Sequence, residues 1–138
     1  MDCLLCRIVA RTEEASVVYE DEWVVAICDL YPVNPGHLFV FPKAHAVGLD
    51  DLAAADGGQM FAVAQRLAAA LRRADLRCEG INLFLADGEA ALQEVFHVHV
   101  HVIPRYKGDG FTLDSGQSSS PTARRDLDAI AARISELL

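Results

Sequence analysis

Three histidines alternate with valines in the run His97-Val98-His99-Val100-His101-Val102-Ile103, which ends at Pro104. This alternation has the period of a β-strand, because successive side chains of a strand point to opposite faces of the sheet. It predicts a strand over residues 95–103, with the histidines on one face and the valines in the core. Side chains on one face recur about every 7 Å, so the three rings cannot all chelate one ion. Near neutral pH an imidazole can act as a nucleophile, a proton donor or acceptor, or a metal ligand. Three on one face therefore indicate a functional groove.

Other periodic runs indicate the fold class. Four further strands are expected at residues 17–19, 23–27, 37–41 and 81–85, because each is a short apolar run between turn signals. An apolar stripe at helical spacing predicts one main helix over about residues 50–76. Gly57-Gly58 weakens its first turns, so its start could lie after them. Five strands with few helices indicate an α+β domain with an antiparallel sheet.

The C-terminal part of the sequence divides into two segments. Residues 114–120 are small and polar, which predicts a linker after a domain of residues 1–113. Ser120-Pro121 has the pattern of an N-cap followed by the first helical residue. Apolar residues at helical spacing, such as Leu127, Ile130 and Ile134, predict an amphipathic helix over residues 121–138. Its apolar face is expected to pack on its own domain or on a partner.

Charge and composition exclude several classes of partner. The formal net charge is −8, whereas proteins that bind long nucleic acids usually present a basic surface. A single nucleotide needs only a few local donors and remains compatible with this charge. No apolar run is long enough to span a bilayer, and no secretory signal is recognisable. We expect a cytoplasmic protein without a membrane or nucleic-acid partner, and with cysteines that form no disulfides.

The histidine run also carries a family resemblance. Residues 97–103 are similar to the signature His-φ-His-φ-His-φ-φ, with φ apolar, of the histidine-triad (HIT) superfamily. The resemblance covers about residues 3–111, and it includes Gly36-His37, Phe41-Pro42-Lys43-x-His45 and Pro104-Arg105 in the expected order. It is greatest to the bacterial branch related to histidine-triad nucleotide-binding proteins, which act on nucleoside phosphoramidates and dinucleoside polyphosphates. The resemblance implies a five-stranded antiparallel sheet, one main helix and short N-terminal and C-terminal helices, with the sheet continued across a homodimer.

The resemblance further implies a reaction. His99 would attack the α-phosphorus and form a covalent nucleotidyl-histidine, so that the chain is a nucleotide hydrolase or transferase acting on P–N or P–O–P bonds. His101 would donate to phosphate oxygens or protonate the leaving group. Asp29 would bind the ribose hydroxyls, although an aspartate that ends a strand is also common as a turn residue. A purine nucleotide is the expected substrate. The implied nucleotide-binding residues are Ile27, Asp29, Leu30, Gln93, His99 and His101.

The N-terminus carries a possible zinc site. Cys3 and Cys6 form a Cys-x-x-Cys pair, a spacing common in structural zinc sites. The resemblance to bacterial relatives adds His45 and His97 as the other two ligands. A Cys₂His₂ site of this kind is structural, because all four positions of the metal are filled. The alternative is a pair of free thiols, with His45 and His97 hydrogen-bonded to each other as in zinc-free relatives.

Three positions before the histidine run depart from the family pattern. Ala86, Leu92 and Glu94 stand where many relatives have Asn, Gly and Ser. A carboxylate next to a phosphate is unfavourable unless it points away or meets a cation. A cationic leaving group such as a lysyl amine would interact favourably with Glu94. These changes concern the leaving group rather than the reaction class. Two other functions remain open: a regulatory nucleotide-binding module with weak catalysis, and a zinc-dependent hydrolase, which the closed Cys₂His₂ set disfavours.

Overall fold

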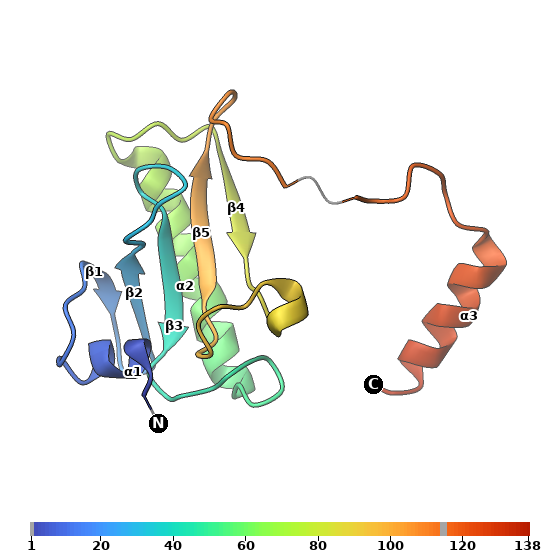
Figure 1. The fold of residues 1–138 in the computed structure, drawn as a ribbon, viewed down its shortest axis with the longest axis horizontal. Coiled ribbons are helices and arrows are strands. Elements are labelled where there is room, and N and C mark those ends of the chain that lie inside the picture. Colours follow the sequence, from blue (N-terminus) through green and yellow to red (C-terminus); the bar gives the residue numbers. More distant parts are fainter. Residues whose placement is uncertain (1, 114–115) are drawn as a thin grey trace.

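The computed structural model describes residues 2–113 and 116–138, and it confirms the predicted α+β class (Figure 1). A five-stranded antiparallel sheet carries one main helix, with short helices near both ends of the chain. In chain order the elements are α1 (Leu4–Val9), β1 (Val17–Glu20), β2 (Val24–Cys28), β3 (Leu38–Pro42), α2 (Ala54–Arg73), β4 (Gly80–Phe84), the 3-10 turn η1 (Glu89–Ala91), β5 (Val100–Arg105) and α3 (Arg124–Ser135).

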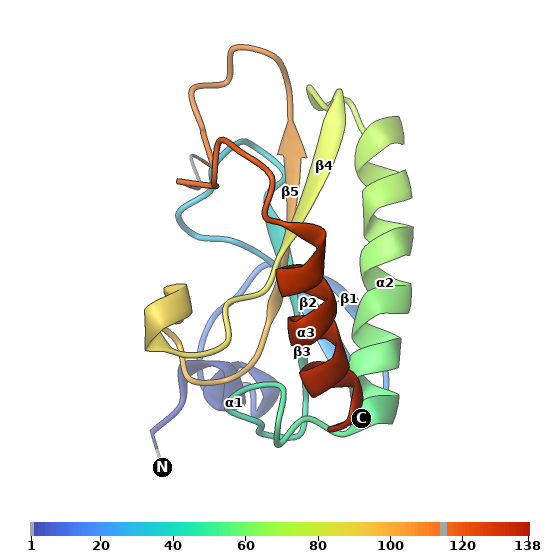
Figure 2. The same cartoon turned by 90° about the vertical axis from the view of Figure 1, so that its right-hand side faces the viewer.

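The sheet has the strand order β1-β2-β3-β5-β4, with every neighbouring pair antiparallel. Helix α2 covers one face, while α1 and η1 lie on the other (Figure 2). Strand β5 therefore lies inside the sheet, between β3 and β4. This position gives the histidine run, from Val100 onward, a neighbouring strand on each side.

Two apolar clusters hold these layers together, one on each face of the sheet. Alternation along β2 shows the division, because Val24 and Ala26 pack under α2 whereas Val25 and Ile27 pack under α1. Val102 of β5 is buried in the α2 cluster and Val100 packs against it, as the alternating pattern predicted. The histidine face of β5 is consequently the face that carries α1 and η1.

The histidine strand begins later than the sequence predicted. Strand β5 starts at Val100 rather than at residue 95, so His97 and His99 precede it. Both neighbouring strands explain this start. On β3 the last residue paired with β5 is Val40, opposite Val100, and on β4 it is Phe84, opposite His101. Strand β3 continues to Pro42, but the chain before Val100 no longer pairs with it, and the amide of Val98 instead donates to the carbonyl of Ala46 at 2.7 Å.

The helices also differ from their predicted bounds. Helix α2 starts at Ala54 and contains Gly57 and Gly58, so a start after the glycines is wrong. The amide of Gly57 already donates to the carbonyl of Ala53 at 3.0 Å. Helix α3 starts at Arg124 and not at Pro121. Of the predicted linker, residues 114 and 115 lie outside the described residues, and residues 116–120 contain neither helix nor strand.

Helix α3 stands clear of the sheet (Figure 1). Its apolar side chains Leu127, Ile130 and Ile134 are exposed, so the chain's own sheet does not cover the face that the sequence predicted to be packed. Within the described ranges, no helix is long and apolar enough to cross a membrane.

Candidate functional site

His99 presents one free ring nitrogen to the open face of the sheet. Its Nδ1 lies 2.8 Å from the backbone carbonyl oxygen of His97. A carbonyl can only accept, so Nδ1 carries a proton, and in the neutral ring Nε2 is the nitrogen with the lone pair. The ring of Phe39 packs against the imidazole, with 5.1 Å between centroids. His99 is thus an oriented imidazole whose Nε2 points away from this hydrogen bond, which is what a nitrogen nucleophile requires.

His101 belongs to a chain of hydrogen bonds that a backbone amide fixes. The N–H of Val33 donates to Nδ1 of His37 at 3.0 Å, so the proton of neutral His37 resides on Nε2. This Nε2 lies 2.8 Å from Nδ1 of His101, which must then accept. Neutral His101 therefore carries its proton on Nε2. A carboxylate oxygen of Asp29 lies 3.3 Å from Nε2 of His37 and 3.7 Å from Nδ1 of His101.

Burial keeps both of these histidines neutral at pH 7. It lowers the pKa of His101 to about 4, with further lowering by His99 and His37 and an opposing effect of Asp29. Burial also lowers the pKa of His37, against the attraction of the Asp29 carboxylate. Because both rings are neutral, the direction of the hydrogen-bond chain from Val33 to His101 is retained.

His37 has no role in the sequence interpretation, yet it directly contacts His101. The signal was present in the strand pattern. His37 is two residues from Phe39, and Phe39 is the residue of β3 that pairs with His101. Residues two apart in an extended chain share a face, so pairing of the third strand with the histidine strand would have placed His37 beside the site.

The four predicted metal ligands converge at the other end of the histidine run. Nδ1 of His97 lies 3.3 Å from Sγ of Cys3, and Nδ1 of His45 lies 3.3 Å from Sγ of Cys6. The two Nδ1 atoms are 3.2 Å apart, and all four ligand atoms lie within 4.8 Å of one another. A tetrahedral zinc site with bonds of about 2.0–2.3 Å has edges of roughly 3.3–3.8 Å. The three distances of 3.2–3.3 Å agree with the short end of this range.

A second contact orients His97 toward this cluster. Its ring is fully buried, and Nε2 lies 2.7 Å from the carbonyl oxygen of Pro42. That carbonyl accepts, so Nε2 carries the proton and Nδ1 faces the thiols with its lone pair. Metal-binding histidines commonly donate their other N–H to a carbonyl in this way.

The predicted nucleotide-binding residues lie in different surroundings. Asp29 is near His37 and His101, and its other oxygen accepts from the amide of Tyr31 at 2.9 Å, as in an aspartate turn. Leu30 follows it and is 83% exposed, whereas Ile27 is buried in the cluster under α1. The roles of these residues toward a nucleotide stay predictions.

Gln93 is engaged with the backbone of its own surroundings. Its side-chain amide donates to the carbonyl oxygens of Val47 and Val95, and its Oε1 accepts from the amide of Gly88 at 2.8 Å. The side chain is buried. Gln93 thus holds the loop before the histidine run in place, and its role as a nucleotide-binding residue stays a prediction.

The sequence matches the family model of the HIT domain over residues 10–108. The chain belongs to the HIT family. A crystal structure of a HIT family member from Bacillus subtilis is 35% identical, with a TM-score of 0.91 over 100% of this chain and 98% of that chain. A zinc-bound histidine triad family protein from Mycobacterium smegmatis is 38% identical, with a TM-score of 0.78 over 100% and 99% of the two chains. A hypothetical histidine triad nucleotide-binding protein from Sulfolobus tokodaii strain7 is 31% identical, with a TM-score of 0.72 over 97% and 90%.

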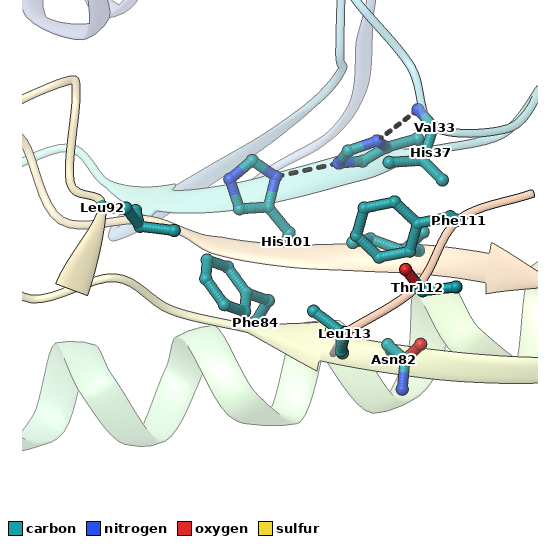
Figure 3. Close-up of a pocket in the computed structure, with 10 residues that line it drawn as sticks. Val33, His37, Asn82, Phe84, Leu92, His101, Phe111, Thr112 and Leu113 are labelled. Carbon is teal, nitrogen blue, oxygen red and sulfur yellow. Dashed lines mark hydrogen bonds between the residues drawn. The ribbon is translucent and has the colours of Figure 1, made fainter. Parts of the chain in front are cut away.

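The loop that departs from the HIT pattern borders a cavity of about 350 Å³ beside His101 (Figure 3). Leu92 lines this cavity and has a φ of 72°, in the left-handed region. Glu94 is exposed and is not among the residues that line the cavity. The repulsion between Glu94 and a phosphate that the sequence suggested therefore does not arise in this cavity.

Proposed function

We propose that the chain is a nucleotide hydrolase or transferase that cleaves the α-phosphate bond of a nucleoside phosphoramidate or dinucleoside polyphosphate through a nucleotidyl-His99 intermediate. One observation carries this proposal: Nδ1 of His99 is committed to the carbonyl of His97, which leaves the Nε2 lone pair free. Membership of the HIT family supports nucleotide binding and hydrolase-type chemistry.

The first displacement uses His99 and His101 together. The Nε2 lone pair of His99 forms a bond to the α-phosphorus, and the bond from phosphorus to the leaving nitrogen or oxygen breaks. As the anionic phosphate binds, it favours protonation of His101, whose Nδ1 takes a proton from solvent on the side of the Asp29 carboxylate. Nε2 of His101 then gives its own proton to the leaving atom, and the Nδ1 proton returns to solvent once Nε2 is protonated again in the second step. Asp29, 3.7 Å from Nδ1 of His101, stabilises the transient positive charge.

The second displacement reverses these roles. Water attacks the phosphorus and its proton passes to Nε2 of His101, which the first step left neutral. The bond between phosphorus and His99 breaks, and its electron pair returns to Nε2. The product is the nucleoside monophosphate. Splitting one hydrolysis into two displacements is the advantage of covalent catalysis.

In the substrate complex, Asp29 accepts hydrogen bonds from the ribose hydroxyls, for which its two oxygens are well suited. Leu30 and Ile27 contact the base, with a purine preferred. Gln93 lies near the phosphate oxygens, and it acts there by holding the amide of Gly88 in place.

The same proposal includes a structural zinc ion held by Cys3, Cys6, His45 and His97. The spacing of their donor atoms supports it, as does the zinc-bound relative from Mycobacterium smegmatis. When bound, the ion would supply a crosslink between α1 and the chain before β5, and no catalytic step. One hydrogen bond then connects its ligand His97 to the nucleophile, because the carbonyl of His97 orients His99.

We also propose a homodimer. Strand β4 ends the sheet within the described residues, and the apolar face of α3 is exposed. A second copy of the chain is the occupant that would cover both surfaces, in agreement with the family resemblance. Light scattering coupled to size-exclusion chromatography should give twice the mass of 15.0 kDa.

The test of the reaction uses an adenosine 5′-phosphoramidate and a diadenosine polyphosphate. The wild-type protein should release adenosine monophosphate from at least one of them. Mass spectrometry of the quenched reaction should show an adenylylated peptide that contains His99. Turnover that survives His99→Ala, or that chelators abolish without loss of fold, contradicts the proposal. Binding without turnover of any nucleotide would instead identify a regulatory module.

A further inference from the structure

The cavity beside His101 has a markedly apolar lining (Figure 3). None of the residues that line it carries a formal charge at neutral pH, since its two histidines are neutral. The oxygen of its one amide side chain, Asn82, accepts from Arg105 at 2.7 Å. The residues that matter for the argument are Phe84, Leu92, Ile103, Phe111 and Leu113.

The cavity extends from His37, which lies 3.3 Å from Asp29, past His101 to Phe84 and Leu92, and only this second end lies away from the nucleoside side of the site (Figure 3). Asp29 follows β2, which is separated from β5 by β3. Phe84 belongs to β4, the other neighbour of β5. A nucleoside and a leaving group are attached to the same phosphorus. If the nucleoside lies toward Asp29, the leaving group extends toward Phe84 and the cavity.

Leu92 stands at one end of the cavity in a conformation that leucine rarely adopts. Its φ of 72° lies in the left-handed region, which favours glycine. The surrounding loop holds it there, because its own amide donates to the carbonyl of Glu89 and the amide of Gln93 donates to that of Gly88. The side chain is nevertheless 75% exposed. Backbone strain of this kind is typical of ligand-binding positions, and here it places an apolar side chain over a cavity, which indicates a ligand contact.

We propose that this cavity binds the leaving group and that Leu92 makes it selective for an apolar one. The substrate class is then a nucleoside 5′-phosphoramidate of an apolar amine, rather than a dinucleoside polyphosphate. Apart from His101, which gives its proton to the leaving atom, a polyphosphate leaving group would meet no cation in this lining and would lose its hydration there. This inference rests on the proposed function, and it assigns to Leu92 a specificity-determining role.

The experiment compares two substrates that differ only in the apolar surface of the leaving group. They are the adenosine 5′-phosphoramidates of 2-phenylethylamine and 2-methoxyethylamine, whose amines have similar basicity. Burial of a phenyl ring should give wild type a kcat/KM ratio of about 10 or more in favour of the first. Diadenosine tetraphosphate should be turned over more slowly than either.

Variants connect this ratio to the cavity. Leu92→Gly relieves the backbone strain and should lower the ratio by about threefold or more, and Phe84→Ala should lower it as well. The matched control is Leu49→Gly, which removes an exposed leucine outside the cavity and should leave the ratio unchanged.

The outcomes separate this inference from the proposed function. A wild-type ratio near 1, or a ratio that neither cavity variant changes, overturns the apolar leaving-group site while the nucleotidyl-His99 reaction stands. A preference for diadenosine tetraphosphate overturns it in the same way. Absence of turnover with all three substrates contradicts the proposed function itself.

Discussion

His97 and His99 are two residues apart in one run, yet they belong to different sites. His97 is fully buried and directs Nδ1 to two thiols and a second imidazole, whereas His99 faces the open side of the sheet. The difference lies in which nitrogen donates to a backbone carbonyl. Nε2 of His97 donates to Pro42, and Nδ1 of His99 donates to His97. The chemistry of each ring therefore depends on the backbone acceptor that it meets.

The largest expected effect is the loss of activity on replacing His99, the histidine on the open side of the sheet. His99→Ala should lower kcat/KM on a nucleoside phosphoramidate by about 10⁴-fold or more, because no other group replaces the attacking nitrogen. It should change the free energy of unfolding by only about 1 kcal/mol. Steady-state kinetics and urea denaturation measure the two quantities. The comparison breaks down if His99→Ala unfolds the protein or keeps its activity.

Changes in the buried Cys/His cluster around His97 should mainly affect stability. Cys3→Ala removes one of four donors and should lower the free energy of unfolding by about 4 kcal/mol or more, with loss of the bound zinc. Cys28→Ala is the matched control, because Cys28 is exposed and lies outside the cluster. Elemental analysis should find one zinc per wild-type chain and none in Cys3→Ala. A wild-type protein without zinc would contradict the zinc site and favour the alternative in which Cys3 and Cys6 are free thiols.

The free energy of unfolding measured against pH tests the site around His101 without changing the metal ligands. The pKa of His101 falls from an ordinary 6.5 to about 4 in the folded protein. Between these values the unfolded chain binds a proton that the folded chain does not. Stability is therefore complete above pH 6.5 and is lost as the pH falls toward 4, by about 2–3 kcal/mol from this residue.

The variant His101→Gln should remove this part of the pH dependence. Its curve of unfolding free energy against pH should be shallower than that of wild type between pH 6.5 and 4. Subtracting the two curves cancels the titration of the carboxylates and of the metal ligands. Parallel curves would show that His101 does not titrate as its burial requires.

The sequence predicted which residues belong to these sites better than it predicted how they are arranged. Alternation placed Val100 and Val102 in the core, and the resemblance brought together Cys3, Cys6 and two distant histidines, because both depend on order along the chain. The start of β5 was missed because it depends on where the neighbouring strands β3 and β4 stop pairing. The bond from Gln93 to the carbonyl of Val47 was missed for the same reason, since it joins residues that are 46 apart.

The smallest expected effect concerns His37, because its role depends on one hydrogen bond to His101. Nε2–H of His37 donates to Nδ1 of His101 and keeps the other nitrogen of His101 protonated toward the substrate. Gln retains an N–H group near the position of the histidine Nε2, whereas Leu does not. His37→Leu should therefore lower kcat by about tenfold with little change in KM, and His37→Gln should lose about threefold or less. Equal losses in the two variants would mean that His37 only fills space, because Leu and Gln fill it similarly.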